Sequence, residues 1–290
     1  MIGCYALWML GTTWLAAVFL PLGWVATCVA IALHSSLQHE VLHGHPFRSR
    51  RLSEAMVFPA IGLAIPYMRF RDTHLAHHRD SILTDPYDDP ESNYLDPVVW
   101  QTLPGWKRFA LSFNNTLMGR MLIGPIVSQW VFVKSDLRKI KGGDRAALAG
   151  WLWHVPGIAL VLTWLITVGA MPFWAYLLAA YGGLSLLKIR TFLEHQAHEK
   201  ARGRTVVIED RGPLAALFLN NNYHVVHHMH PAVPWYRLPA LYQANRDRYL
   251  NRNDGYRYRS YGEVFRRYLF RAKDGVAHPL WSSAPVDREM

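Results

Sequence analysis

The chain has 290 residues, of which 51% are hydrophobic and 18% charged, and its formal net charge is +10. A basic chain is compatible with nucleic acid, an anionic membrane surface or an acidic protein partner. No Asp, Glu, Lys or Arg occurs before Glu40 or from Trp151 to Leu187, and two such apolar runs argue against nucleic acid. The charge imbalance instead matches the excess of Lys and Arg on the cytoplasmic side of membrane proteins. The only cysteines, Cys4 and Cys28, exclude a disulfide framework and a cysteine-ligated iron–sulfur site.

The first uncharged run covers residues 1–39. It is about twice the ~20 residues with which an α-helix crosses a bilayer. Pro21-Leu22-Gly23 lies near its middle, as expected for a turn. The run therefore predicts a hairpin, with one helix over residues 2–20 and a second that starts near Trp24 and continues through His39 and His43. The arginines that follow place both ends of the hairpin on the cytoplasmic side: Arg48, Arg50 and Arg51.

The connecting segments, residues 46–150, are too short or too polar to cross a membrane. Residues 55–68 are apolar but contain Pro59 and Pro66, which predicts a re-entrant or interfacial segment. Residues 79–97 are acidic and proline-rich, and we interpret them first as a solvated loop and second as a polar rim over a functional site. Residues 106–121 carry apolar side chains at helical spacing among basic and polar ones, which predicts a single helix lying in the membrane interface.

The second uncharged run, residues 151–187, again has room for two helices, with a turn at residues 169–172. Its second helix leads to Lys188 and Arg190, which are expected on the cytoplasmic side. The two runs predict an all-α integral membrane protein with four transmembrane helices in two hairpins, and with both termini and a helical cap in the cytoplasm. The chain is then a single domain, with a first hairpin at about 1–45, connecting segments at 46–150, a second hairpin at 151–190 and the cap and basic tail at 191–290.

Histidines are concentrated in four groups, and the spacing within them is typical of metal ligands. Imidazoles three or four residues apart share one face of a helix and can converge on one point. One H-x-x-H-H pattern occurs by chance easily, but two such patterns and an H-x-x-x-H do not. The groups are His39 and His43; His74, His77 and His78; His195 and His198; and His224, His227 and His228.

These groups predict a site for two metal ions. Imidazole is a suitable ligand for iron, zinc, copper or nickel. Nine or more imidazoles exceed the needs of one tetrahedral zinc and suit two ions of higher coordination number. All four groups lie on the same side of the predicted membrane, so separated helices can contribute to one centre.

In this order and spacing, the groups resemble the histidine boxes of the membrane-bound fatty-acid desaturases and the related hydroxylases, over residues 33–231. Residues 190–195 resemble the segment that supplies an additional ligand histidine in that family. The resemblance implies a non-haem centre of two iron ions, O2 as co-substrate and a lipid or acyl substrate. It assigns the metal ligands as His39, His43, His74, His77, His78, His195, His224, His227 and His228.

Three further residues have two interpretations each. Glu40 is expected to orient a ligand imidazole from behind, since an acidic residue at this place is common in the family that the chain resembles. His198 could share a helix face with His195, or it could be a surface residue. Asn220, four residues before His224, could hold a metal-bound water, or it could be a polar residue on the helix surface.

The first group also allows a different reading. His39-Glu40-Val41-Leu42-His43 is an H-E-x-x-H sequence, the pattern of zinc proteases in which the glutamate is the general base. An intramembrane metalloprotease is therefore an alternative. Such an enzyme needs only one more ligand, and the remaining histidines would then have no role.

The electrons for O2 chemistry are expected from another protein. The sequence has no haem motif, cysteine cluster or dinucleotide-binding fingerprint. An external donor of the ferredoxin, rubredoxin or cytochrome type is therefore expected, and the basic tail could bind it, bind anionic lipid or only reflect the positive-inside rule. The spacing of the boxes favours introduction of a double bond into an acyl chain. The alternative is a hydroxylase or ketolase of a lipid or carotenoid with the same di-iron site.

Overall fold

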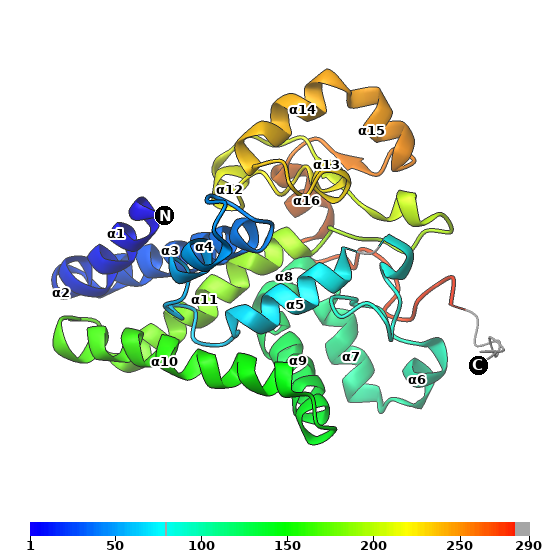
Figure 1. Ribbon diagram of the computed structural model, residues 1–290. Helices are drawn as coiled ribbons and strands as arrows, with labels where there is room; N and C mark the ends of the chain where they lie inside the picture. The colour runs from blue at the N-terminus through cyan, green and yellow to red at the C-terminus, as the bar shows by residue number, and fades with distance from the viewer. Residues whose placement is uncertain (79, 282–290) are drawn as a thin grey trace.

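The computed structural model describes residues 1–78 and 80–281, and these are mostly helical. Long helices lie side by side, and shorter helices gather at one end of them (Figure 1). Arg79 of the acidic segment and residues 282–290 of the basic tail lie outside the described residues. The longest helices are α3 (Leu20–Leu42), α9 (Gly124–Lys141), α10 (Arg145–Thr167) and α11 (Phe173–Thr191).

The first hairpin turns earlier than the sequence predicts. Its first arm consists of α1 (Ile2–Leu10), the π-helical turn η1 (Gly11–Leu15) and α2 (Ala16–Val18), and the chain reverses at Phe19, whose backbone is extended. Pro21 belongs to the first turn of α3, where its missing N–H costs no hydrogen bond. A Cβ on Gly23 would lie 2.7 Å from the Ala16 backbone, so this glycine allows the two arms to pack closely and does not form the turn.

The second hairpin is formed by α10 and α11, and its turn lies at residues 168–172, as predicted. α11 packs along α3 with unusually small residues at the contact. A Cβ on Gly182 would lie 2.6 Å from Cys28 Sγ, and one on Gly183 would lie 2.6 Å from Ile31 Cγ2. Such close approach of helices is typical of packing inside membranes. It also fixes the end of α3 relative to the end of α11, where His39 and His195 are found.

Two helices, α3 and α10, have the length and apolar composition needed to cross a membrane. The arm at Ile2–Val18 is apolar but shorter. The expectation of four spans therefore remains a prediction.

The apolar segment at 56–66, between α4 (Arg50–Ala55) and α5 (Tyr67–His77), is irregular and lies against α9, α10 and α11. Its carbonyl groups accept hydrogen bonds from side chains of these helices: Tyr176 Oη donates to Ile61 at 2.7 Å, His154 Nε2 to Leu63 at 2.8 Å and Gln129 Nε2 to Ala64 at 2.7 Å. Irregular backbone at membrane depth needs such partners. The segment leads directly into α5, which carries the second histidine box.

The interfacial helix expected at 106–121 is two helices, α7 (Gly105–Asn114) and α8 (Leu117–Leu122). The chain breaks between them because Thr116 acts as an N-cap, and its hydroxyl accepts a hydrogen bond from Gly119 N at 3.0 Å. The apolar face of α7 is nevertheless exposed as predicted: Trp106 is 69% exposed and Phe109 is 76% exposed.

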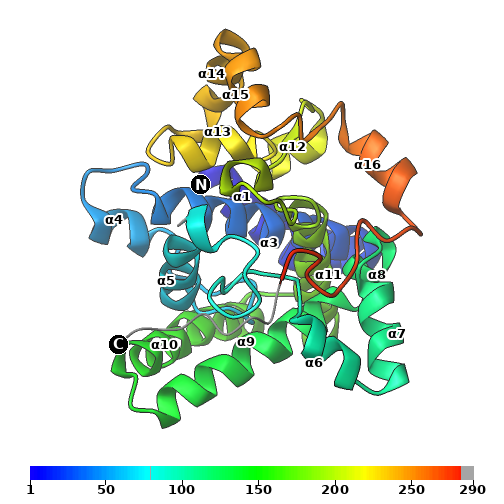
Figure 2. The same ribbon diagram turned by 90° about the vertical axis from the view of Figure 1, so that its right-hand side faces the viewer.

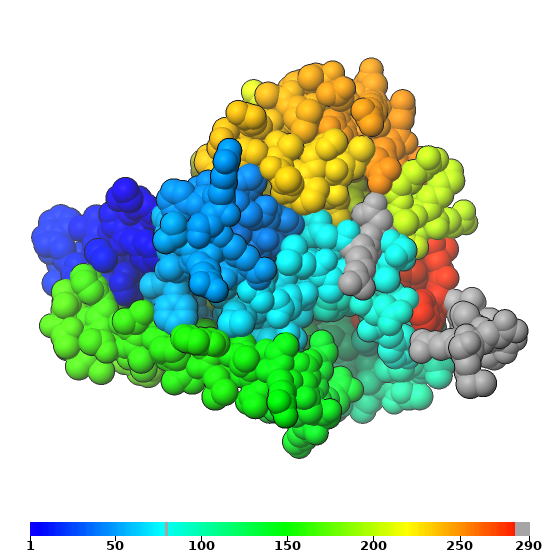
Figure 3. All heavy atoms as spheres, viewed as in Figure 1, coloured from blue at the N-terminus to red at the C-terminus, as the bar shows by residue number. Residues whose placement is uncertain are grey.

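The elements that follow α11 form a cap at the end of the long helices (Figure 2). Its core includes the buried tyrosines Tyr223, Tyr242 and Tyr249, and in Figure 3 the helices α13 to α15, yellow to orange, form one lobe over this core. Two short strands, β1 and β2, pair in parallel within it. The shorter elements are η2 (Asp80–Ile82), α6 (Pro97–Thr102), η3 (Ala201–Arg204), β1 (Val207–Ile208), α12 (Pro213–Leu217), α13 (His224–Met229), η4 (Trp235–Arg237), α14 (Leu238–Ala244), α15 (Arg246–Arg252), β2 (Arg257–Tyr258) and α16 (Tyr261–Tyr268).

Candidate metal centre

Four segments bring histidines to the end of the α3–α11 pair. His39 lies in the last turn of α3 and His43 is its C-terminal cap, so the two rings share one face, with centroids 4.9 Å apart. α5 carries the second box at its C-terminal end and α13 consists almost entirely of the third. His195 follows the end of α11 in extended backbone, where it forms an isolated bridge with Thr205.

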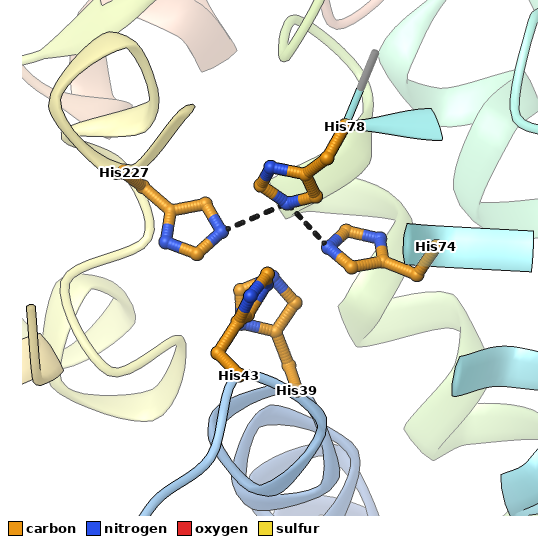
Figure 4. A group of neighbouring side chains, drawn as sticks. All are labelled: His39, His43, His74, His78 and His227. Atoms are coloured by element: carbon orange, nitrogen blue, oxygen red, sulfur yellow. Dashed lines mark hydrogen bonds between the residues drawn. The ribbon is translucent and has the colours of Figure 1, made fainter. Parts of the chain in front are cut away.

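The histidines divide into two groups, and within each group the candidate ligand atoms lie within 4.8 Å of one another. Figure 4 shows the first group, to which α3, α5 and α13 all contribute. The first group is His39, His43, His74, His78 and His227, and the second is His77, His195, His224 and His228. All nine residues that the resemblance assigns as ligands are thus collected at two adjacent points; His77, in the second group, lies one residue before His78, in the first.

The inner nitrogens approach one another closely. His78 Nε2 lies 3.0 Å from His74 Nε2 and 3.2 Å from His227 Nε2, and these contacts are the dashed lines in Figure 4. In the second group His195 Nε2 lies 2.9 Å from His77 Nε2 and 3.2 Å from His224 Nε2. Several lone-pair nitrogens directed at one another are favourable when a cation lies among them.

The outer nitrogens have hydrogen-bond acceptors that determine the tautomer. His77 Nδ1 donates to Asp89 at 2.7 Å, and His74 Nδ1 donates to Glu91 at 2.9 Å. His224 Nδ1 donates to the side-chain oxygen of Asn221 at 3.2 Å. A proton on Nδ1 leaves the lone pair of Nε2 directed into the group, which is the arrangement found behind metal-ligating histidines.

Burial keeps most of these rings neutral, as metal ligation requires. Desolvation lowers the pKa of His78, His195, His224 and His227, and the neighbouring histidines lower each of these pKa values further. His77 behaves differently. Burial opposes its protonation, but the carboxylates of Glu91 and Asp89 outweigh burial and raise the pKa of His77 to about 9. The second group therefore lies in a negative potential that attracts a cation.

Unsatisfied polar atoms give an independent test of whether metal ions fit. His39 Nε2 and His43 Nε2 are buried and have no hydrogen-bond partner among the described residues. A buried polar nitrogen without a partner costs free energy, so such atoms are rare unless they bind something. Metal ions with a preference for imidazole would satisfy both nitrogens, and the donor set of these groups fits two such ions.

Two residues for which the sequence left two interpretations open, His198 and Asn220, lie outside both histidine groups. His198 is in neither group, because α11 ends at Thr191 and no helix face connects it with His195; its ring lies 3.4 Å from Asp254 at the surface. Asn220 precedes α13, has a left-handed backbone with φ of 55°, and donates to the carbonyl of Trp235.

Glu40 also differs from the expectation, since it does not orient an imidazole. Its carboxylate accepts a hydrogen bond from the backbone N–H of Trp235 at 3.1 Å. Trp235 begins η4, shortly after the third box, so Glu40 links the end of α3 to the segment that follows α13. The residue therefore holds the first and third boxes together through the backbone.

Sequence reasoning missed the residues behind the ligands. Asp89 and Glu91 lie in the acidic segment interpreted as a solvated loop, yet Asp89 is only 5% exposed and also accepts from Thr84 N at 2.9 Å. Asn221, not Asn220, contacts His224, and its amide also donates to Glu194 at 2.9 Å. The weaker interpretation, a polar rim over the site, was the correct one for Asp89 and Glu91. The sequence alone gives no sign of which acidic residues face inward.

A small polar cavity of about 40 Å³ adjoins the second group. Its walls include Glu91, Glu194, His195 and the largely buried Lys273, whose Nζ donates to the carbonyl of His195 at 2.6 Å. A polar cavity of this size has room for water. The acidic segment and the end of the chain thus enclose the second group from one side.

Residues 12–260 match the family model described as fatty acid desaturase. The chain belongs to this family. Two similar proteins are named beta-carotene ketolase: one from Paracoccus sp. (strain N81106 / MBIC 01143), 27% identical over 229 residues, and one from Paracoccus sp. (strain PC1), 24% identical over 226 residues. The first alignment covers 77% of each chain and the second 75% of each. Family membership confirms the resemblance drawn from the histidine boxes, and it supports an oxidoreductase of the desaturase and ketolase kind over the zinc-protease alternative.

Replacing Asp89 tests the role of the carboxylates. In Asp89→Ala, His77 loses the acceptor that orients its ring, and loss of such a partner typically weakens metal binding by about 10–100-fold. We expect iron in the purified variant to fall from about two equivalents toward about one when a chelator is titrated, as measured by elemental analysis. Asp88→Ala is the matched control, because Asp88 is the exposed neighbour in the same segment. Equal iron retention in the two variants would contradict this role.

Replacing Glu40 tests whether its hydrogen bond to Trp235 stabilises the fold. Glu40→Ala removes the acceptor of the Trp235 N–H, and leaving a buried hydrogen-bonding group without its partner costs about 1–3 kcal/mol of stability. Glu40→Gln keeps an acceptor oxygen and should unfold close to the wild-type temperature with its iron retained. Thermal unfolding and iron content of the detergent-purified proteins measure this. If both variants unfold at an equally lowered temperature, the charge of Glu40 and not its hydrogen bond stabilises the fold.

Proposed function

We propose that this chain is a membrane-embedded, O2-dependent non-haem di-iron oxidoreductase that acts as a ketolase on a carotenoid. The two adjacent histidine groups carry the proposal, because nine imidazoles gathered at two points, three of them with hydrogen-bond acceptors behind the ring, provide ligands for two redox metals. The nine residues of the two groups are the proposed ligands. The same family membership that supports the di-iron centre also covers enzymes of the ketolase kind.

The ketolase reaction is preferred to acyl desaturation for one reason. Both relatives are named beta-carotene ketolase, and each alignment covers three quarters or more of both chains. In the sequence analysis, the spacing of the boxes favoured desaturation. This spacing describes only the metal ligands, so it does not distinguish an enzyme that forms a double bond from one that forms a ketone. The alternative of a ketolase is therefore at least as well supported, and we adopt it.

Bound iron would supply O2 activation and abstraction of hydrogen from an unactivated C–H bond. The protein's own residues bind the ions and orient the ligands. The histidines hold the ions, and Asp89, Glu91 and Asn221 hold three of the rings in orientation through their Nδ1 protons. The rings are buried or half-buried, which limits contact between the metal centre and bulk water.

Conversion of a methylene group to a ketone requires an external source of electrons. The balanced reaction consumes two molecules of O2, four electrons and four protons, and releases three molecules of water. We propose the same class of donor that the sequence predicts, an external ferredoxin, rubredoxin or cytochrome. The carotenoid, or the alternative acyl chain, would reach the centre from the membrane.

The proposed topology has four spans, with both termini and the metal centre in the cytoplasm. It is supported by α3 and α10, which are long and apolar enough to cross, and by their antiparallel partners in the two hairpins. It is also supported by the absence of Lys and Arg from the two turns at the opposite end, near Phe19 and residues 168–172.

The reaction product tests the proposed function. Cells that make β-carotene and express the chain under isotopically labelled O2 should accumulate a carotenoid that has lost two hydrogens and gained one labelled oxygen at a ring carbon. Mass spectrometry of pigment extracts measures this. His227→Ala should abolish the product, whereas His230→Ala, which alters a neighbouring histidine outside both groups, should retain it. A fatty acid lighter by two hydrogens, with unchanged carotenoids, would instead identify a desaturase.

Cysteine labelling tests the topology. A membrane-impermeant thiol reagent added to intact cells should label Val18→Cys and Ala170→Cys, which lie at the turns of the two hairpins. It should not label Asp88→Cys or Gln243→Cys, which are exposed near the metal centre and in the cap. The native Cys4 and Cys28 are buried and give little background. Labelling of Asp88→Cys from outside would reverse the proposed orientation.

A further inference from the structure

A groove of about 310 Å³ between β2 and α16 is lined almost entirely by arginines: Arg257, Arg259, Arg266 and Arg267, with Glu263 as the one acidic residue. We propose that this groove binds the phosphate headgroup of an anionic phospholipid at the cytoplasmic surface of the membrane. The inference rests on the membrane setting of the proposed function but not on the substrate that the metal centre oxidises.

The positive charges in the groove are not fully balanced by the acidic residues that the structure describes. Glu263 is already engaged, since it accepts from Arg267 at 2.6 Å and from the backbone of Arg259 at 2.7 Å. Arg257 is paired with Glu209 at 2.7 Å. Within residues 1–78 and 80–281, neither Arg259 nor Arg266 has a carboxylate partner. The groove therefore offers two guanidinium groups without a counter-ion, and guanidinium binds phosphate with paired hydrogen bonds.

The position of the groove favours a lipid. α16 packs on α8, and the chain after it is joined to α8 by a hydrogen bond from Met118 N to the carbonyl of Leu269 at 2.9 Å. Phe270 follows directly and is 77% exposed. α7 precedes α8 and presents the exposed aromatic rings of Trp106 and Phe109. In Figure 2, α16, α8 and α7 lie along one edge of the molecule.

Exposed aromatic rings and unpaired arginines on neighbouring elements indicate a membrane interface. Aromatic side chains enter the headgroup region, and basic side chains beside them meet the lipid phosphates. α7 shows the same combination by itself, since Lys107 and Arg108 lie between Trp106 and Phe109. An acidic electron carrier would also be attracted by the arginines, but three exposed aromatic rings in the same region fit acyl chains better than an acidic protein surface.

The experiment measures binding of a short-chain phosphatidylglycerol to the purified full-length protein in neutral detergent, with short-chain phosphatidylcholine as the zwitterionic comparison. We expect tighter binding of phosphatidylglycerol. Arg259→Gln/Arg266→Gln should weaken it by about thirtyfold, because each basic residue near an anionic lipid surface contributes roughly fivefold. Binding of phosphatidylcholine should not change. The iron content of the variant reports whether it is folded.

The matched control is Arg202→Gln/Arg248→Gln, which removes the same charge from exposed positions elsewhere in the cap and should leave phosphatidylglycerol binding unchanged. Arg259→Lys/Arg266→Lys is a second variant that keeps the charge but loses the paired geometry, and it should show a smaller loss. Equal weakening in the glutamine variant and its control would overturn the proposal. So would unchanged lipid binding together with slower turnover driven by an acidic ferredoxin, which would identify the groove as the donor site.

Discussion

The structure depends on placing nine imidazoles from four segments around two points. Burying that many polar rings is unfavourable unless each nitrogen has a partner, and the protein provides acceptors on the outer side of three of the rings. Asp89, Glu91 and Asn221 accept from Nδ1 atoms, whereas the inner Nε2 atoms face only one another. The stability of this region is therefore coupled to metal binding, because the ions would replace the missing inner partners.

The rest of the fold holds the four histidine-bearing segments in position. Small residues let α11 approach α3, which sets the ends of both helices beside each other. α5 is held by a buried ion pair: Arg69 donates to Asp136 of α9 through two hydrogen bonds of 2.8 and 2.9 Å, and Trp151 of α10 donates to the same carboxylate at 2.9 Å. Removing one partner of such a pair typically costs about 3–5 kcal/mol. The position of the second box thus depends on Asp136, a residue of α9 that is far from this box in the sequence.

The sequence predicted those features that depend on local spacing. The two uncharged runs gave the two hairpins, and the histidine spacing identified the residues that the fold gathers. The sequence could not locate the turn of the first hairpin. Pro21 and Gly23 are equally compatible with a hairpin turn and with the start of a helix that packs closely against its neighbour. Nor could it distinguish Asp89 from Asp88, since their difference arises from how a loop folds back on α5.

The same limit applies to His198 and Asn220, for each of which the sequence left two interpretations open. The metal-binding interpretation of each residue assumed that a helix continued through it, so that helical spacing put the side chain on the metal face. In the structure α11 ends before His195, and the chain enters α13 through two residues with left-handed backbone, Leu219 and Asn220. Helix boundaries are determined by tertiary packing as much as by local sequence, so a ligand assigned from spacing is secure only within a box.

The two histidine groups are not equivalent, and the difference bears on how the centre works. The first has five imidazoles, three of them from α3 and α13, and among the described residues its carboxylate contact is Glu91 behind His74. The second has four imidazoles, with Asp89 behind His77, Glu194 3.9 Å from His224 Nδ1, and a polar cavity beside His195. Negative potential favours the higher charge on a bound cation, and a polar cavity gives access to water. The protein thus places more carboxylates, together with the cavity, on the side of the second group than on the side of the first.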